Sequence, residues 1–163
     1  MTGDADVDCA FVDDNAQVAI LLVQAHALLP PPTAPEIKYG SYLARAEEVV
    51  DFCVKGWDDV NGGGIRWHIS TSGPPWTNRN ACSTSLTSVA CLSLAKALLQ
   101  EGAARDDQLV DRLVAWGIKC VDWVWETLVQ ITNPEKRGYG LVMDGLVQSR
   151  REGEWKLAGP TYS

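Results

Sequence analysis

The stretch Asn15–Leu29, NAQVAILLVQAHALL, decides how this sequence folds. Its apolar residues are spread around the whole circumference of a helix with 3.6 residues per turn, which predicts a helix buried on every side. The prolines at positions 30–32 cannot continue a helix, so they mark its end. A second stretch, Ser83–Gln100, is also apolar or small all round and predicts a second buried helix.

Each buried helix is followed by a stretch that is apolar on one side only. Ser41–Lys55 and Asp107–Val129 carry apolar residues at spacings of three and four, and their charged residues face away from that stripe. The order of buried helix and one-sided helix then repeats after roughly 70 residues. The glycine-rich loop at 62–65 is echoed by a second one at 138–141. The sequence therefore repeats one helical hairpin followed by one long loop.

Such a repeat predicts an all-α fold. We expect an incomplete (α/α)6 toroid of about two hairpins, each with a buried inner and an amphipathic outer helix, and with residues 1–163 as one partial domain. The shorter turns, 30–40 and 101–106, lie at one end of the helices, so the long loops 56–82 and 130–163 lie at the other end. The residues expected at that face are Asp13, Asp14, Trp67, Asn78, Arg79, Asn80, Asp144, Thr161 and Tyr162.

Composition excludes some classes of function. The net charge is −7 and no stripe of Lys and Arg is present, which argues against a nucleic-acid partner. No apolar run reaches the roughly 18–20 residues of a membrane span. The acidic segment Met1–Asp8 has no apolar core of the kind found in secretory signals, so no signal is expected there.

The cysteines show neither the pairing nor the spacing of a metal site. The sequence has five, with no Cys-x-x-Cys pair. Most lie in apolar helical patterns, so we expect buried reduced thiols rather than a disulfide or a metal site, and no cofactor. The cysteines are Cys9, Cys53, Cys82, Cys91 and Cys120.

The pair Asp13-Asp14 at the start of the first buried helix has two interpretations. Acidic residues are favoured at a helix N-terminus as caps and through the helix dipole. Two carboxyl groups about 5–5.5 Å apart can instead cleave a glycosidic bond with retention, one as nucleophile and one as acid/base. The residue pattern alone leaves both interpretations open.

The tryptophans are numerous, seven in all. A tryptophan can fill a core, or it can offer a flat face to a sugar ring. For Trp67, in the glycine-rich loop, the two uses are equally expected, whereas Trp123 and Trp125 lie within the last helix and are predicted to pack.

Four other polar residues have a structural and a functional interpretation. Asn80 can cap the helix that follows or bind sugar hydroxyl groups, and Asp144, which precedes a glycine, favours a turn but is placed to reach the same face. His68 is predicted to be a hydrogen-bonded loop residue, and His26 a satisfied core histidine within the first helix.

Taken in order, these segments resemble glycoside hydrolase family 76, the endo-α-1,6-mannanases. The resemblance implies that Asp13 is the nucleophile and Asp14 the acid/base, that configuration is retained, and that no metal is needed. It also implies an α-mannan substrate contacted by Trp67, Asn80, Asp144 and Tyr162, and a secreted or cell-surface location. The matching segments are Asp13–Ala16, Tyr42-Leu43 with Ala46, Gly62–Trp67, Arg79–Ser83, Asp122–Glu126, Gly140–Gly145 and Thr161-Tyr162.

The family toroid has six hairpins, and the resemblance here covers about two. An inner helix without its neighbours leaves apolar flanks open, which predicts self-association. Two other functions remain open: an inactive carbohydrate-binding fragment, and a sugar epimerase on a similar toroid that would depend on His26 or His68. The pattern does not separate hydrolysis from transglycosylation, because both use the same covalent intermediate.

Overall fold

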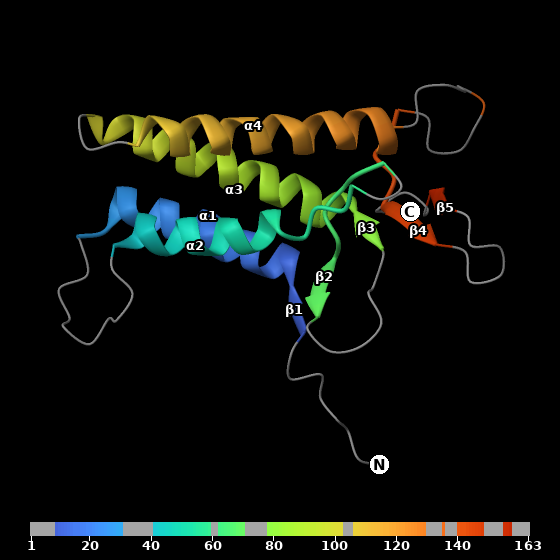
Figure 1. Ribbon diagram of the computed structural model, residues 1–163, viewed down its shortest axis with the longest axis horizontal. Coiled ribbons are helices and arrows are strands. Elements are labelled where there is room, and N and C mark those ends of the chain that lie inside the picture. Colours follow the sequence, from blue (N-terminus) through green and yellow to red (C-terminus); the bar gives the residue numbers. More distant parts are fainter. Residues whose placement is uncertain are drawn as a thin grey trace, which may run out of the picture.

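The computed structural model describes residues 9–30, 41–59, 62–70, 78–102, 106–129, 135, 140–148 and 155–157. Helices make up most of this part of the chain and lie side by side (Figure 1). They form the two hairpins that the sequence predicts, so the chain is a mostly helical, partial toroid. The helices are α1 (Val12–Leu28), α2 (Tyr42–Val54), α3 (Ala81–Gln100) and α4 (Asp107–Trp123), which continues into the π-helical turn η2 (Val124–Leu128).

Polar residues set the start of three helices. The Ser41 hydroxyl accepts a hydrogen bond from the amide of Ala44 in α2, and the Asn80 side chain accepts one from the amide of Ser83 in α3. Asp106 caps α4 in the same way. These are the residue types that satisfy the free amides of a first helical turn. The capping interpretation of Asn80 is therefore confirmed.

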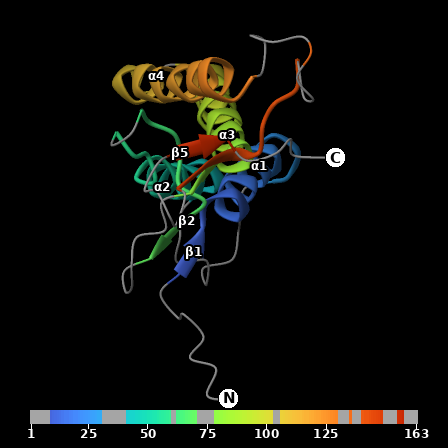
Figure 2. The same cartoon turned by 90° about the vertical axis from the view of Figure 1, so that its right-hand side faces the viewer.

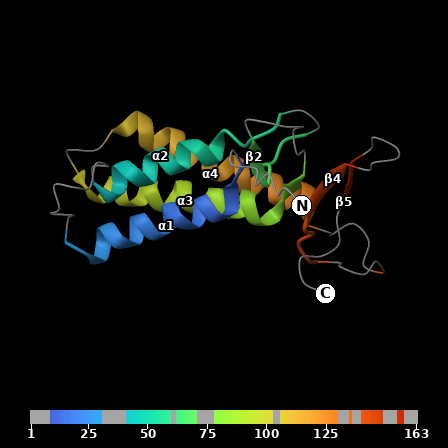
Figure 3. The same ribbon diagram turned by 90° about the horizontal axis from the view of Figure 1, so that it is seen from below.

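The two inner helices, α1 and α3, pack against each other, and each packs against its own outer helix (Figure 3). Small residues allow this close approach. Ala16, Ala19 and Ala90 are fully buried, and Gly117 of α4 lies so close to Leu92 that a Cβ atom there would be 2.5 Å from the leucine side chain. The core thus lies between the four helices, with small residues where they approach most closely.

The composition of the inner helices predicts that they are buried on every side, but the structure shows that they are not. Val18 and Leu21 on α1 and Val89 on α3 are exposed, Leu21 by 60%. The physical reason is that two hairpins provide neighbours for only part of each inner helix. The buried positions of α1 are Val12, Ala16, Ala19 and Val23.

The expectation that no apolar stretch reaches the length of a membrane span is wrong for α3, which is long and apolar enough by length and composition, with a mean hydropathy of 1.4. Half of that stretch is buried inside the protein, against α1, α2 and α4. A core helix of a folded domain has the same composition, so this property alone does not place the chain in a membrane.

Short strands, which the sequence analysis assigned to loops, lie together at one end of the helices (Figures 1 and 2). This end holds the start of α1 and α3, as expected for the long loops. Antiparallel pairing joins β1 to β2, and joins β3, β4 and β5 in that order. The strands are β1 (Cys9–Phe11), β2 (His68–Ser70), β3 (Arg79–Asn80), β4 (Gly145–Gln148) and β5 (Trp155–Leu157).

Candidate active site

The aspartate pair lies inside the first turn of α1 and does not cap it. The helix begins at Val12, its N-cap is Phe11, and no side chain caps it. The amide of Val12 instead donates to the carbonyl oxygen of Trp67 at 2.9 Å. The interpretation of Asp13 and Asp14 as caps is therefore wrong, although their charge still suits the positive end of the helix dipole.

Trp67 orients the first carboxylate of the pair. Its indole N–H donates to Asp13 Oδ2 at 3.2 Å, and the amide of Asp14 donates to Asp13 Oδ1 at 3.1 Å. The Trp67 ring packs against Phe11, with ring centroids 5.0 Å apart, but remains 39% exposed. The tryptophan thus both packs in the loop and presents a surface beside Asp13.

A pocket of about 320 Å³ is lined by Trp67, whose indole contacts Asp13, although neither aspartate of the pair is among its lining residues. It brings together Trp67, Asn80 and Asp144, three of the residues that the sequence analysis places at the cleft. Tyr162, the fourth expected sugar contact, lies outside the described residues. The residues that line the pocket are Trp67, Asn78, Arg79, Asn80, Asp144, Gly145 and Val147.

Asp144 and Gly145 do not form the turn that this dipeptide favours. Gly145 is the first residue of β4 and pairs with Asn80 of β3, while the carbonyl oxygen of Asp144 accepts the amide of Ala81 at 2.7 Å. A Cβ atom at position 145 would lie 2.1 Å from the carbonyl oxygen of Arg79. Only glycine allows the two strands to approach so closely.

The site carries negative charge. Partial burial, and then the charges of Asp13, Asp144 and Asp14, raise the pKa of the Cys82 thiol. The charges of Asp144 and of the aspartate pair therefore all reach the Cys82 thiol at the start of α3, although these residues come from segments far apart in sequence. Cys82 is exposed, so the expectation of a buried thiol is wrong at this position.

The other described free cysteines, Cys53, Cys91 and Cys120, are buried thiols, as expected. Burial raises the pKa of each of these thiols to about 12. Within the described part of the chain, no group of three or more His, Cys, Asp and Glu residues is placed to hold a metal ion.

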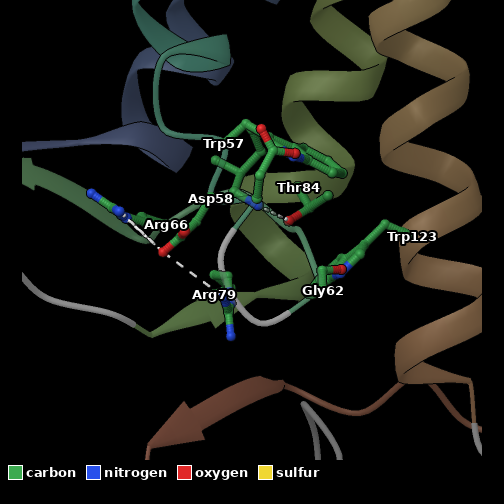
Figure 4. Close-up of polar contacts among 9 residues, drawn as sticks. Trp57, Asp58, Gly62, Arg66, Arg79, Thr84 and Trp123 are labelled. Carbon is green, nitrogen blue, oxygen red and sulfur yellow. Dashed lines mark hydrogen bonds and ion pairs between the residues drawn. The ribbon is translucent and has the colours of Figure 1, made fainter. Parts of the chain in front are cut away.

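The charges of Asp58, Arg66 and Arg79 meet in one cluster (Figure 4), a grouping that the sequence analysis did not predict, and Arg79 also lines the pocket. Asp58 Oδ2 accepts from Arg66 Nη2 at 3.0 Å and Nε at 3.2 Å, and lies 3.8 Å from Arg79 Nη1. The side chain of Arg79 is completely buried, and Asp58 is only 5% exposed. Burial lowers the pKa of Arg79, and the charge of Asp58 opposes that change. No periodic pattern marks these residues in the sequence.

The glycine-rich loop packs against two tryptophans, Trp57 and Trp123. The indole N–H of Trp123 donates to the carbonyl oxygen of Gly62 at 2.9 Å (Figure 4), and Gly64 has a φ of +95°. The amide of Ile65 donates to Thr84 Oγ1 at 3.1 Å, which joins the loop to α3. The packing role expected of Trp123 is confirmed.

Three further expectations meet mixed outcomes. His68, predicted to be a loop residue, lies instead in strand β2 and is buried. His26 is not a core histidine, because it is partly exposed at the far end of α1 and its Nε2 lies 2.8 Å from Glu101 Oε1. Trp125, predicted to pack, lies in η2 and is 62% exposed, so this prediction is wrong.

Comparison with known proteins agrees with this architecture. The model of Glycosyl hydrolase family 76 matches residues 7–162, and the chain therefore belongs to this family. The chain is 40% identical over 151 residues to the Meiotically up-regulated gene 191 protein of Schizosaccharomyces pombe. The matched region covers 92% of this chain and 30% of that protein.

Solved structures show the same fold. An alpha-1,6-mannanase from Salegentibacter sp. HEL1_6 has a TM-score of 0.62 and 26% identity, with 91% of this chain and 35% of that chain covered. A family 76 mannosidase from Bacteroides thetaiotaomicron VPI-5482 has a TM-score of 0.63 and 21% identity, with 93% and 34% covered. The chain thus spans about a third of the length of the relatives it matches.

Proposed function

We propose that this chain carries the catalytic centre of a retaining glycoside hydrolase that acts on α-1,6-linked mannan. The observation that carries the proposal is the position of Asp13 and Asp14 in the first turn of α1, beside a pocket formed by Trp67, Asn80 and Asp144. Adjacent residues of a helix point about 100° apart, so two carboxyl groups can approach one anomeric centre from different directions.

The resemblance to family 76 implies the role of each carboxylate, and the surroundings of the two carboxylates support that assignment. Asp13 receives two hydrogen bonds, from the Trp67 indole and the Asp14 amide, so its direction is fixed, as a nucleophile requires. Asp14 is more exposed and can exchange a proton with water, as an acid/base must. Asp13 then attacks the anomeric carbon while Asp14 protonates the leaving oxygen. Water, deprotonated by Asp14, releases the sugar from Asp13.

The relatives support this assignment. Solved structures of the Salegentibacter mannanase include an inactive variant in which two consecutive aspartates are replaced by asparagine, in complex with alpha-1,6-mannotriose. A second inactive variant, with alanine at both positions, is in complex with alpha-1,6-mannotetrose. This chain is 25% identical to each of these variants. Of the other functions, an epimerase would depend on His26 or His68, and neither lines the pocket: His26 contacts Glu101 near the end of α1, and His68 is buried in β2.

The test is reducing-sugar release from linear α-1,6-mannan, with mannotriose binding measured in parallel by calorimetry. We expect Asp13→Asn to lower turnover by roughly a thousandfold or more, as loss of a nucleophile does. Asp111→Asn is the matched control, since it makes the same chemical change at an exposed position of α4. Asp13→Asn should still bind mannotriose.

Each result has a distinct meaning. Mannotriose binding without release would make this chain a carbohydrate-binding piece of the toroid. Equal turnover by the native chain and Asp13→Asn would refute the catalytic assignment, and absence of both binding and release would refute the proposed function of this chain.

A further inference from the structure

The carboxylate of Asp58 lies where two segments of the pocket meet (Figure 4). Arg66, which directly precedes Trp67, donates two hydrogen bonds to its Oδ2 atom. Arg79, which directly precedes Asn80, forms an ion pair with the same oxygen. The buried Asp58 carboxylate therefore joins Arg66 and Arg79, which are the neighbours of the expected sugar contacts Trp67 and Asn80. Asp58 itself lies in the segment after α2 and does not line the pocket.

Backbone bonds carry this connection to the aspartate pair. Arg66 and Arg79 form an antiparallel bridge, and the amide of Trp67 donates to the carbonyl oxygen of Asn78 at 3.0 Å. The carbonyl oxygen of Trp67 in turn accepts the amide of Val12, the first residue of α1. Any displacement of the Arg66 segment must therefore reach Trp67 and the start of the helix that holds Asp13.

Charge explains why the carboxylate is needed. Arg66 and Arg79 carry like charges that repel each other across the bridge, and Arg79 is completely buried. Removing a partner of a buried charge is unfavourable, because water cannot replace it without opening the structure. Without Asp58, the least costly relaxation is for the two segments to separate, which would widen the pocket.

We infer that Asp58 is a positioning residue, which holds Trp67 and Asn80 at the separation at which the pocket accepts a mannosyl unit. It does not touch the sugar, and it acts through Arg66 and Arg79. The identity of the sugar rests on the proposed function, whereas the role of Asp58 in holding the two segments does not.

The first test needs no ligand. In Asp58→Asn, amide hydrogen exchange measured by NMR should become about tenfold faster or more at Val12, Trp67 and Ala81, while amides within α2 keep their protection. These three amides make the backbone bonds between the pocket segments. Asp59→Asn is the matched control, since the neighbouring carboxylate is exposed and bonds only outside this cluster, to Trp57 and Lys119. It should leave the three amides unchanged.

Arg66→Gln provides a second variant in case Asp58→Asn does not fold. The Arg66 side chain is 36% exposed, and when it is replaced Arg79 still lies beside the buried Asp58 carboxylate. We expect faster exchange at Trp67 and Val12 in this variant as well. Unchanged exchange at these amides, or an equal acceleration at every protected amide, would overturn the inference, because a purely structural residue would change all of them together.

The second test measures mannotriose affinity by calorimetry at a temperature where each variant is fully folded by circular dichroism. Asp58→Asn should raise the Kd by about tenfold, and Asp59→Asn should not. Unchanged affinity in a folded Asp58→Asn would overturn the positioning role. If the native chain does not bind mannotriose, the proposed function fails, and hydrogen exchange alone decides whether Asp58 holds the two segments.

Discussion

Replacing Gly64 by alanine tests the close packing of the glycine-rich loop against α4. Gly64 has a φ of +95°, and a Cβ atom there would lie 2.4 Å from Trp123 Cζ2, 2.6 Å from Cε2 and 2.7 Å from Cη2. All three are atoms of a buried ring whose indole N–H is bonded to Gly62, so the ring has no simple way to move aside.

Two separate costs add in this variant. A side chain at positive φ costs about 1–2 kcal/mol. Forcing extra volume into a packed region costs a further ~1–3 kcal/mol. Gly62→Ala is the matched control, because its φ is +90° and nothing lies within 4 Å of the added atom. Gly62→Ala therefore carries only the cost of a side chain at positive φ, so the difference in stability between the two variants measures the collision with Trp123.

The assay is thermal unfolding followed by circular dichroism. A chain of this length loses about 2–4 °C of Tm for each kcal/mol of stability. Gly64→Ala should therefore melt roughly 2–12 °C below Gly62→Ala. Equal melting temperatures would refute the reasoning, since they would mean that Trp123 does not hold the loop at this distance.

Three further predictions concern the thiols, the tryptophan and the exposed flank. Burial raises the pKa of Cys53, Cys91 and Cys120 from 9.0 to about 12. Between these two pH values the unfolded chain loses thiol protons that the folded chain keeps. The free energy of unfolding therefore falls as pH rises from about 9 to about 12. Urea unfolding at a series of pH values measures this slope, and Cys91→Ala should make it shallower; a slope that Cys91→Ala leaves unchanged would contradict the assignment. Trp123→Phe removes the donor to the Gly62 carbonyl and should cost about 1–3 kcal/mol in the same assay, whereas no loss would show that the bond contributes nothing. Leu21→Glu should reduce self-association in sedimentation velocity, because Leu21 belongs to the exposed flank of α1. The control Gln108→Glu adds the same charge at an exposed position of α4, and equal behaviour of the two variants would argue against self-association through the flank of α1.

Periodicity predicts the helices of this fold well, because each helix carries its own pattern and its own boundary signals. The prolines after Leu29 and the cap residues Ser41 and Asn80 are local features, and the structure confirms the boundaries that they indicate. Burial is predicted less well, because it depends on how many neighbours a helix has. His26 shows this: the apolar residues around it indicate a core position, yet it lies on a side of α1 that is partly exposed.

The short strands could not be predicted from local sequence. A strand of two residues such as β3 has no alternation to detect, and it forms only because β4, more than 60 residues later, lies beside it. The same limit applies to the cluster of Asp58, Arg66 and Arg79. Its charges come from three separate segments, one of them β3, and only the fold shows that both arginines meet one carboxylate. The sequence did indicate Trp67, Asn80 and Asp144, because a resemblance and the loop argument both placed them at one end.

The start of α1 differs from the starts of the other helices in a way that concerns the aspartate pair. Ser41, Asn80 and Asp106 cap α2, α3 and α4 with their own side chains. At α1 the carbonyl oxygen of Trp67 satisfies the first helical amide instead, so neither carboxylate of the pair is used for capping. The helix dipole still favours their charge. The loop that carries Trp67 therefore contacts Asp13 through the indole and the first helical amide through the backbone, so it positions both the carboxylate and the start of its helix.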